Sequence, residues 1–478
     1  MDEGTHKRPT LLVALIPIIF LIGILSIGVF VYGQDAHILL AISACFAGLV
    51  GKYLGYSWKE MEEQIMKSIG LSMQASFILM TVGILVAVWI ASGVVPTMIY
   101  YGLMVIHPTI FLATVLIVCS VVSLTIGSSW STAATVGIAF MGIGIALGVP
   151  APMVAGAVIS GAYFGDKMSP LSDTTNLASA VTGVNLFDHI RHMMYTTGPA
   201  LLIAFVLYVV MGFQFGGGEY VDTQVAEITA AISSAFNVNL IMLLPVVFVI
   251  VMIVKKIPAL PGLWVGIFMG VLFKFIFQLG HYEDFNDAMG TLLTSMNWGF
   301  ESATGHEVID SLFSGGGLQG MLYSVSIIFC SMAFAGIIEK TKCLEVVTQS
   351  LLSLAKSIGS LVLVSNFSAF FTNVITGDQY LSVVLPGRMY KGEFEKRGYD
   401  TKNFSRCIED SGTMTSPLVP WNACALYMSA TLGVATVEYL PYVFLNLATP
   451  IISIILGFTG ITMVKLKLES KNNDAAAT

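Results

Sequence analysis

One run of residues without formal charge constrains the fold more than any other feature. Between Lys67 and Asp166, 98 consecutive residues include no Asp, Glu, Lys or Arg. A soluble domain of that length would carry charge on roughly a quarter of its residues. The whole chain of 478 residues is 56% hydrophobic and 11% charged, so most of its apolar surface must face lipid. The sequence therefore predicts an all-α polytopic membrane protein.

The composition also excludes several classes of protein. A net charge of −7 offers no basic surface for nucleic acid. The six cysteines form no CxxC pair, so we expect neither a disulfide framework nor a zinc site. The chain contains no Walker motif, no HExxH and no GxSxG. We therefore predict that it is not an enzyme and that it uses neither ATP nor a cofactor.

The basic residues predict the topology, because Lys and Arg mark the cytoplasmic ends of spans. Lys7 and Arg8 precede the first apolar run, and Lys465 and Lys467 follow the last span, about 441–464. Both termini are therefore predicted to be cytoplasmic, with about ten full spans in the bilayer.

Two segments are predicted to lie outside. Residues 275–339 contain no Lys or Arg but several acidic residues, which indicates an external acidic segment at about 280–320. Residues 216–238, which begin with three glycines, are expected to form an external linker between two halves of the chain.

Residues 357–388 fit a re-entrant hairpin better than a pair of spans. Basic residues lie beyond both of its ends. Its apolar arms, 358–371 and 379–387, are too short as helices to cross roughly 30 Å of hydrocarbon. Its tip, 372–378, is polar, and non-helical backbone at that depth requires a protein or water partner.

A counterpart occurs in the first half. Residues of about 108–150 form two apolar arms on either side of the polar tip 127–132. The charge-based topology places the ends of this hairpin outside, so the two hairpins are predicted to enter the membrane from opposite faces.

Each hairpin is followed by an apolar segment that a polar patch interrupts. These predicted broken helices are about 151–187 and about 405–433. The tripeptide Ser-Pro-Leu occurs in both, at 169–171 and 416–418. Matching interruptions in two halves of opposite topology are typical of secondary transporters. We therefore predict two inverted-topology repeats, residues 1–215 and 239–478.

Acidic residues at these breaks are the candidate ion carriers, because a carboxylate within a span is costly unless it has a function. Hard cations prefer oxygen ligands, and a desolvated carboxylate can exchange a cation for a proton. We predict Asp166 and Asp173 as ligands of transported sodium and as proton carriers. The other candidate cation- or proton-binding residues are Ser129, Ser131, Thr132, Thr174, Thr175, Asn176, Thr372, Asn373, Asp378, Glu409, Asp410 and Asn422.

Simpler roles remain open for the acidic candidates, because caps and ion pairs also place carboxylates near helix ends. The alternatives are a helix cap for Asp173 and for Asp378, an ion pair with Lys167 for Asp166, and an ion pair with Arg406 for Glu409 and Asp410.

The motifs Gly127-Ser-Ser-Trp-Ser-Thr132 and Gly165-Asp-Lys-Met-Ser-Pro-Leu-Ser-Asp-Thr-Thr-Asn176 resemble the NhaC family of sodium/proton antiporters, part of the ion-transporter superfamily. The resemblance implies exchange of cytoplasmic sodium for external protons across a bacterial inner membrane by alternating access. It also implies a homodimer in which a transport domain moves against a scaffold. Asp166, Asp173 and residues 174–176 are the positions that match the family's motif.

One branch of this family looks like exchangers of malate and protons for lactate and sodium, and the motifs are compatible with both branches. The topology places none of the five arginines in mid-membrane, and arginine often binds dicarboxylates. This favours sodium/proton exchange modestly, since helix amino ends can replace arginine. A cation channel is a third alternative.

Overall fold

The computed structural model describes residues 6–466 except 216–218, 256, 304–309 and 311–312. All regular secondary structure of these residues is helical, apart from two isolated antiparallel bridges. Nine of the described helices are long and apolar enough to cross a bilayer, or up to eleven spans if each of two sharply bent helix pairs counts as one. The predicted all-α polytopic class is confirmed.

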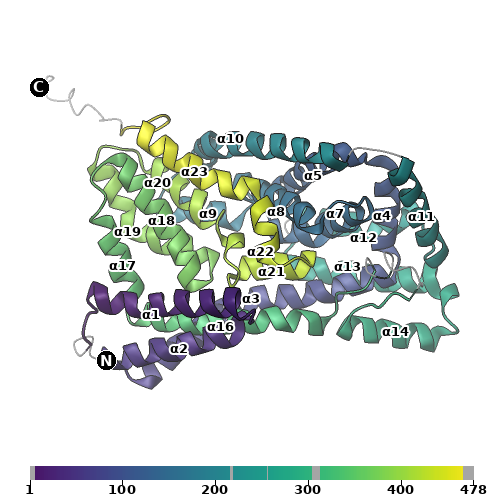
Figure 1. The fold of residues 1–478 in the computed structure, drawn as a ribbon, viewed down its shortest axis with the longest axis horizontal. Helices are drawn as coiled ribbons and strands as arrows, with labels where there is room; N and C mark the ends of the chain where they lie inside the picture. Colours follow the sequence, from purple (N-terminus) through teal and green to yellow (C-terminus); the bar gives the residue numbers. More distant parts are fainter. Residues whose placement is uncertain (1–5, 216–218, 256, 304–309, 311–312, 467–478) are drawn as a thin grey trace, which may run out of the picture.

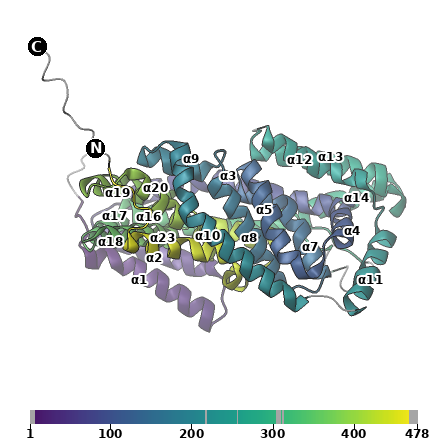
Figure 2. The same ribbon diagram turned by 90° about the horizontal axis from the view of Figure 1, so that it is seen from above.

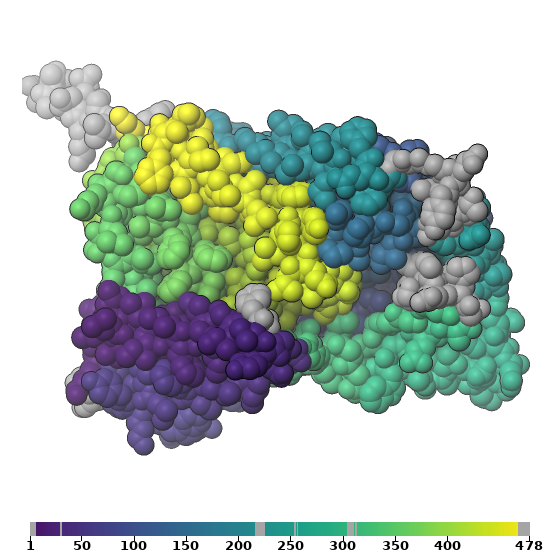
Figure 3. Space-filling model, viewed as in Figure 1, coloured from purple at the N-terminus to yellow at the C-terminus, as the bar shows by residue number. Residues whose placement is uncertain are grey.

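Helices from two distant parts of the chain form one slab along an edge of the molecule (Figure 1). It consists of α1 (Leu11–Leu25), α2 (Ala36–Tyr53), α3 (Trp58–Ala91) and α16 (Leu318–Lys340), and α16 packs between α2 and α3. α3 is long because a capping box of Ser57 starts it well before its apolar run. In Figure 3 α1 and α2 form one continuous face.

The remaining helices pack above or beside this slab (Figures 1 and 2). In the first half they are α4 (Val94–Val105), α5 (Phe111–Ile126), α6 (Ser129–Thr132), α7 (Ile138–Ala146), α8 (Ala151–Met168), α9 (Asp173–Thr182) and α10 (Leu186–Gly212). In the second half they are α11 (Glu219–Ala235), α12 (Leu244–Val254), α13 (Ala259–Phe273), α14 (Phe285–Trp298), α17 (Cys343–Leu352), α18 (Ile358–Thr376), α19 (Gln379–Lys396), α20 (Thr401–Gly412), α21 (Ala423–Leu432), α22 (Thr436–Tyr439) and α23 (Phe444–Thr459).

The two ends of the molecule differ in the elements that form them. α1 begins and α23 ends at the end where α17 lies, and α11 and α14 lie at the opposite end (Figure 1). Most of the segment predicted as a linker, 216–238, forms the helix α11. The predicted acidic segment, 280–320, contains α14, which packs on α3, and its residues 304–309 and 311–312 lie outside the described part.

The second hairpin, α18 and α19, has longer arms than its sequence indicated. The helices are 19 and 18 residues long. Polar residues near the tip continue α18 to Thr376, and α19 continues beyond the predicted end of its arm to Lys396. Thr372 and Thr376 donate their hydroxyls to the carbonyls four residues earlier, at 2.8 Å each. α18 is therefore long and apolar enough to be a candidate span, and the re-entrant depth of this hairpin stays a prediction.

The two hairpins enter from opposite ends. At the base of the first, the Thr109 carbonyl packs against Gly212, where α10 ends. At the base of the second, Gly359 packs against Phe458, where α23 ends. These two helix ends lie at opposite ends of the molecule (Figure 1). Opposite entry agrees with the predicted topology, and the inverted-repeat relation itself stays a prediction.

Both hairpin tips turn in the same way. Gly127 and Gly377 end the first arms in the left-handed conformation, with φ of 76° and 63°, which favours glycine. The next residues, Ser128 and Asp378, cap the second arms by accepting backbone N–H groups at 3.2 and 2.8 Å. Of the two roles predicted for Asp378, cation ligand and helix cap, the structure thus shows the helix cap.

Close contact between α5 and α8 positions the end of α8. A Cβ atom on Gly165 would lie 2.2 Å from the Leu124 nitrogen and 2.4 Å from the Ser123 Cβ. Because backbone cannot move aside, we expect Gly165→Ala to lower the free energy of unfolding by about 2 to 3 kcal/mol. Thermal unfolding in detergent measures this change.

The matched control is Gly70→Ala in α3, where an added Cβ would meet nothing within 4 Å. Alanine has the higher helix propensity, so this variant should unfold at the same temperature or higher. Equal unfolding temperatures for the two variants would contradict the tight α5–α8 contact.

Candidate ion-binding site

The carboxylate of Asp166 is the centre of the site. It lies in the last turn of α8 and is buried, with 6% of the residue exposed. One oxygen, Oδ2, accepts hydrogen bonds from Ser129 Oγ at 2.6 Å and from the Ser129 backbone N–H at 3.2 Å. The other, Oδ1, accepts from Ser172 Oγ at 2.5 Å. The first hairpin tip and the first broken helix therefore meet at one carboxylate.

Backbone geometry explains why an anionic group is stable there. α6 begins within the polar tip, and Ser129 is its first residue. The first N–H groups of a helix have no partner within the helix, and they carry partial positive charge. Asp166 supplies one of the missing acceptors. A π-helical segment, 133–137, follows, and such segments are frequent at functional sites.

The break after α8 is held open by side chains that satisfy its carbonyls. Asn176 donates to the carbonyls of Pro170 at 2.9 Å and Ser172 at 2.7 Å. Thr175 donates to the carbonyl of Lys167 at 2.9 Å. These two residues therefore stabilise the non-helical backbone, and neither forms a hydrogen bond with the Asp166 carboxylate in the described structure.

Asp173 is placed differently from Asp166. It is the first residue of α9 and is exposed. Across the described residues it has no hydrogen bond or ion pair. Ser172 occupies the N-cap position, but its hydroxyl donates to Asp166 instead of capping the helix. Asp173 thus lies at the open side of the break, next in sequence to a residue that contacts Asp166.

Glu409, from the second broken helix, reaches into the first. It is fully buried in α20. Its Oε1 accepts from the hydroxyls of Thr174 and Thr175, both at 3.2 Å. Its Oε2 lies 2.8 Å from His189 Nε2 on α10. Glu409 therefore contacts His189 and two threonines and does not form the ion pair with Arg406 that was the predicted alternative.

Asp410 forms a buried ion pair between the halves. Lys167 Nζ lies 2.8 Å from its Oδ1, and neither side chain is exposed. Thr196 donates to the same oxygen at 2.8 Å, and Arg406 Nε lies 3.7 Å from Oδ2. Lys167 thus pairs with Asp410 across the two broken helices instead of with Asp166, and the expected alternative of an Asp410–Arg406 ion pair is present in the structure.

A second polar centre forms where the second hairpin tip meets its own broken helix. Asn373 Nδ2 donates to the Gly412 carbonyl at 2.7 Å and to Thr415 Oγ1 at 3.0 Å. Its Oδ1 accepts from Asn422 at 3.0 Å. All the groups that form these hydrogen bonds with Asn373 are neutral. This centre therefore differs from the one at Asp166, which is built around a carboxylate.

Three further predicted ligands are not brought to Asp166 by any hydrogen bond of the described residues. Thr132 and Thr372 donate their hydroxyls to carbonyls of their own helices, at 2.9 and 2.8 Å. Ser131 donates its backbone N–H to the Ser128 cap. The polar tip residues therefore mainly stabilise the hairpin turns.

The sequence model of the Na+/H+ antiporter family matches residues 161–461, which contain the breaks of both broken helices and the whole second hairpin. The chain belongs to the Na+/H+ antiporter family. The resemblance to NhaC proteins is thereby confirmed.

Antiporters with different activities are similar to the chain over almost its full length. It is 37% identical to the Na+/H+ antiporter NhaC of Alkalihalophilus pseudofirmus, covering 96% of this chain and 98% of that one. It is 38% identical to the malate-2H+/Na+-lactate antiporter of Bacillus subtilis, covering 98% of each. It is 36% identical to the arginine/ornithine antiporter ArcD of Halobacterium salinarum, covering 100% of this chain and 98% of that one.

Sequence reasoning missed several residues of the site in this antiporter. Ser172 lies inside the quoted motif, and its place beside Asp173 was a signal that could have been used. His189 and Thr196 gave no such signal, because they contact Glu409 and Asp410, residues more than 200 positions away. Only the packing of α10 against α20 brings them together.

Proposed function

We propose that the chain exchanges sodium for protons across a cell membrane by alternating access, and that Asp166 binds the two ions in turn. The observation that carries the proposal is the enclosure of this buried carboxylate by two hydroxyls, from Ser129 and Ser172, at 2.6 and 2.5 Å. A hydroxyl that rotates its hydrogen away presents a lone pair to a cation. Carboxylate and hydroxyl oxygens suit a small hard cation.

The amino ends of the helices at the breaks favour a cation over an organic anion as the substrate. A malate or lactate carboxylate would need free donors there. Asp166 accepts from the first turn of α6, and Asp173 stands in the first turn of α9. Asp378 and Asn422 cap α19 and α21. Each position thus already holds an oxygen of the chain, which repels or excludes a substrate carboxylate.

We propose a homodimer in a bacterial inner membrane with both termini cytoplasmic, and a carrier in place of an enzyme. The slab of α1, α2, α3 and α16 would be the scaffold, and the hairpins with the broken helices would move against it. Support comes from the family resemblance, from the basic residues near the termini, and from the buried contacts that link both broken helices.

Transport in proteoliposomes tests the proposal. Vesicles that contain the purified protein and an acidic interior are diluted into buffer with sodium, lithium, potassium, malate or arginine, and the pH gradient is followed with a fluorescent dye. We expect sodium alone to dissipate the gradient. If sodium has no effect while malate with sodium does, the chain is an organic-acid exchanger. A response to arginine alone would indicate amino-acid exchange, and ion currents without a pH gradient would indicate a channel.

Asp173 is expected to attract sodium to the site without holding it in the bound state. Because it is exposed and unpaired within the described residues, Asp173→Asn should raise the half-saturating sodium concentration roughly two- to fivefold, with the maximal rate kept. The effect should shrink as the concentration of an inert salt rises. Loss of the maximal rate would instead make Asp173 a direct ligand.

A further inference from the structure

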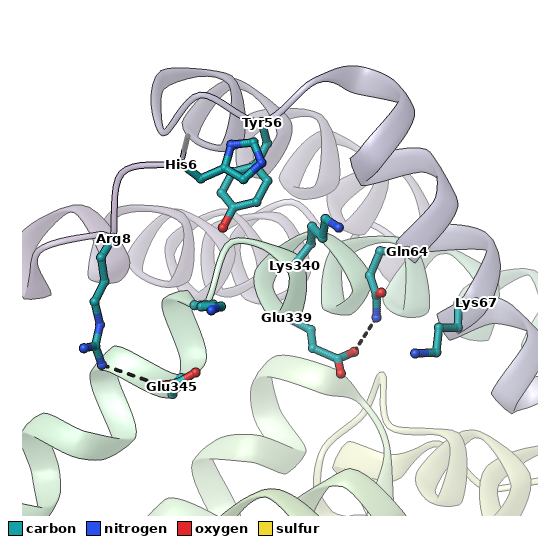
Figure 4. A pocket seen from close by; sticks show the side chains of 9 residues that line it. His6, Arg8, Tyr56, Gln64, Lys67, Glu339, Lys340 and Glu345 are labelled. Atoms are coloured by element: carbon teal, nitrogen blue, oxygen red, sulfur yellow. Dashed lines mark hydrogen bonds and ion pairs between the residues drawn. The ribbon is translucent and has the colours of Figure 1, made fainter. Parts of the chain in front are cut away.

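A charged cavity lies at the end of the molecule where α1 begins (Figure 4). Its volume is about 490 Å³, within the range of small-molecule sites. The segment before α1, the start of α3 and the junction of α16 with α17 form its walls. Charge topology predicts that this face is cytoplasmic.

Positive charge exceeds negative charge in the lining. The charged residues that line the cavity are Arg8, Lys67, Lys340, Lys342, Glu339 and Glu345. Both carboxylates already have partners (Figure 4), since Glu339 accepts from Gln64 at 2.9 Å and Glu345 lies 3.5 Å from Arg8. The three lysines have no ion pair with any described residue. The cavity therefore carries a net positive charge and contains three ammonium groups that have no ion pair with a described residue.

The cavity is built before any ligand arrives. The ring of His6 stacks on Tyr56 at 4.2 Å, and its Nε2 lies 2.9 Å from Glu60. The Lys7 backbone N–H donates to the Leu54 carbonyl at 3.0 Å. These contacts fix the segment before α1 as a wall. On the other side Lys342 has φ of 57°, a conformation that is uncommon for residues other than glycine and is frequent at ligand sites.

The membrane topology alone does not explain why three lysines line one cavity. The positive-inside rule requires basic residues near the cytoplasmic face, but it does not require them to face one cavity. Lys52 and Lys59 on the same face are exposed and do not line the cavity. Lys67, Lys340 and Lys342 come from segments more than 270 residues apart and line the same space.

We propose that this cavity binds a phosphate group, carried either by an anionic lipid headgroup or by a small soluble phosphate compound. Ammonium groups bind phosphate through charge-assisted hydrogen bonds. A bound phosphate would neutralise the lysines and tie α3 to α16 and α17. The inference concerns the scaffold slab and does not depend on which ion the antiporter exchanges.

Thermal unfolding of the full chain tests the proposal with two probes. The first is inorganic phosphate added to detergent-solubilised protein, compared with sodium chloride at matched ionic strength. The second is phosphatidylglycerol in nanodiscs, compared with phosphatidylcholine alone. A ligand that binds only the folded state raises the unfolding temperature, and we expect a rise of about 3 °C from at least one probe. A rise with phosphate assigns a soluble ligand, and a rise with phosphatidylglycerol alone assigns the lipid headgroup.

Two double variants decide whether the cavity is the site. Lys67→Gln with Lys340→Gln should lose the rise, and the matched control Lys52→Gln with Lys59→Gln, which removes the same charge on the same face, should keep it. Both variants should unfold at temperatures close to the wild type without ligand, because none of these four lysines has an ion pair with a described residue. Equal loss in both variants, or no rise with either probe, would overturn the proposal.

Discussion

Replacing Asp166 with asparagine is expected to abolish sodium-dependent proton movement while the protein still folds. Asparagine keeps the shape and can still accept from Ser129, so the fold should lose only about 1 kcal/mol, the value of a typical hydrogen bond. The side chain can no longer release a proton or neutralise sodium. The transport rate should fall at least about a hundredfold, as when a proton-transferring group is removed.

The pH-gradient assay in proteoliposomes measures this loss, with unfolding temperature as the check on folding. In the wild type, the pH dependence of sodium binding is a second readout. If protons and sodium compete for the Asp166 carboxylate, each excludes the other. The half-saturating sodium concentration should fall as pH rises, by up to about tenfold per pH unit where protons dominate. Ser172→Ala, which removes one proposed oxygen ligand, should raise it. Retained exchange by Asp166→Asn would refute the site.

The position of Asp166 could be predicted because the bilayer leaves few explanations for a lone carboxylate. A charge at the end of 98 uncharged residues must be satisfied internally or serve a function. The polar tip at Ser129 and the break at Pro170 were visible for the same reason, since apolar helices do not otherwise tolerate such runs. Local sequence therefore identified the first hairpin tip and the first broken helix separately.

Contacts between the halves could not be predicted. Glu409 lies 235 residues from Thr174, and a carboxylate beside Arg406 has an obvious local partner in the sequence. The structure instead places Glu409 against Thr174 and His189, because α20 packs against α9 and α10. The arm of the second hairpin was underestimated because hydroxyl side chains such as Thr372 can continue a helix into a polar run.

The ion pair between Lys167 and Asp410 should be the most destabilising contact to break. Lys167→Met leaves Asp410 fully buried with Thr196 as a hydrogen-bond donor and Arg406 Nε at 3.7 Å. Removing one partner of a buried pair costs about 3 to 5 kcal/mol. Because Arg406 remains as a second, more distant partner of Asp410, we expect the low end of this range, about 3 kcal/mol. We expect a correspondingly lower unfolding temperature in detergent, and weaker exchange because α8 and α20 are no longer joined.

The triple variant Lys167→Met, Asp410→Leu, Arg406→Met separates the cost of an orphaned charge from the value of the buried charges, because Arg406 is also fully buried and would lose its carboxylate partner without Asp410. Replacing buried ion pairs or triads by apolar side chains is often close to neutral, so the stability of this variant should return to within about 1 kcal/mol of the wild type. If Lys167→Met and the triple variant were equally unstable, the loss would come from side-chain shape and not from charge.

An exposed pair in the same protein serves as the control for burial. Lys396 and Glu393 lie 2.6 Å apart, closer than Lys167 and Asp410, but the Lys396 side chain is 72% exposed. Exposed pairs contribute about 0 to 1 kcal/mol, because water and salt screen the charges. Lys396→Gln should therefore leave the unfolding temperature almost unchanged. The shorter pair is thus the one expected to contribute less to stability. If Lys167→Met lowers the unfolding temperature strongly and Lys396→Gln does not, the strength of the link between the two broken helices comes from the burial of its charges and not from a short distance.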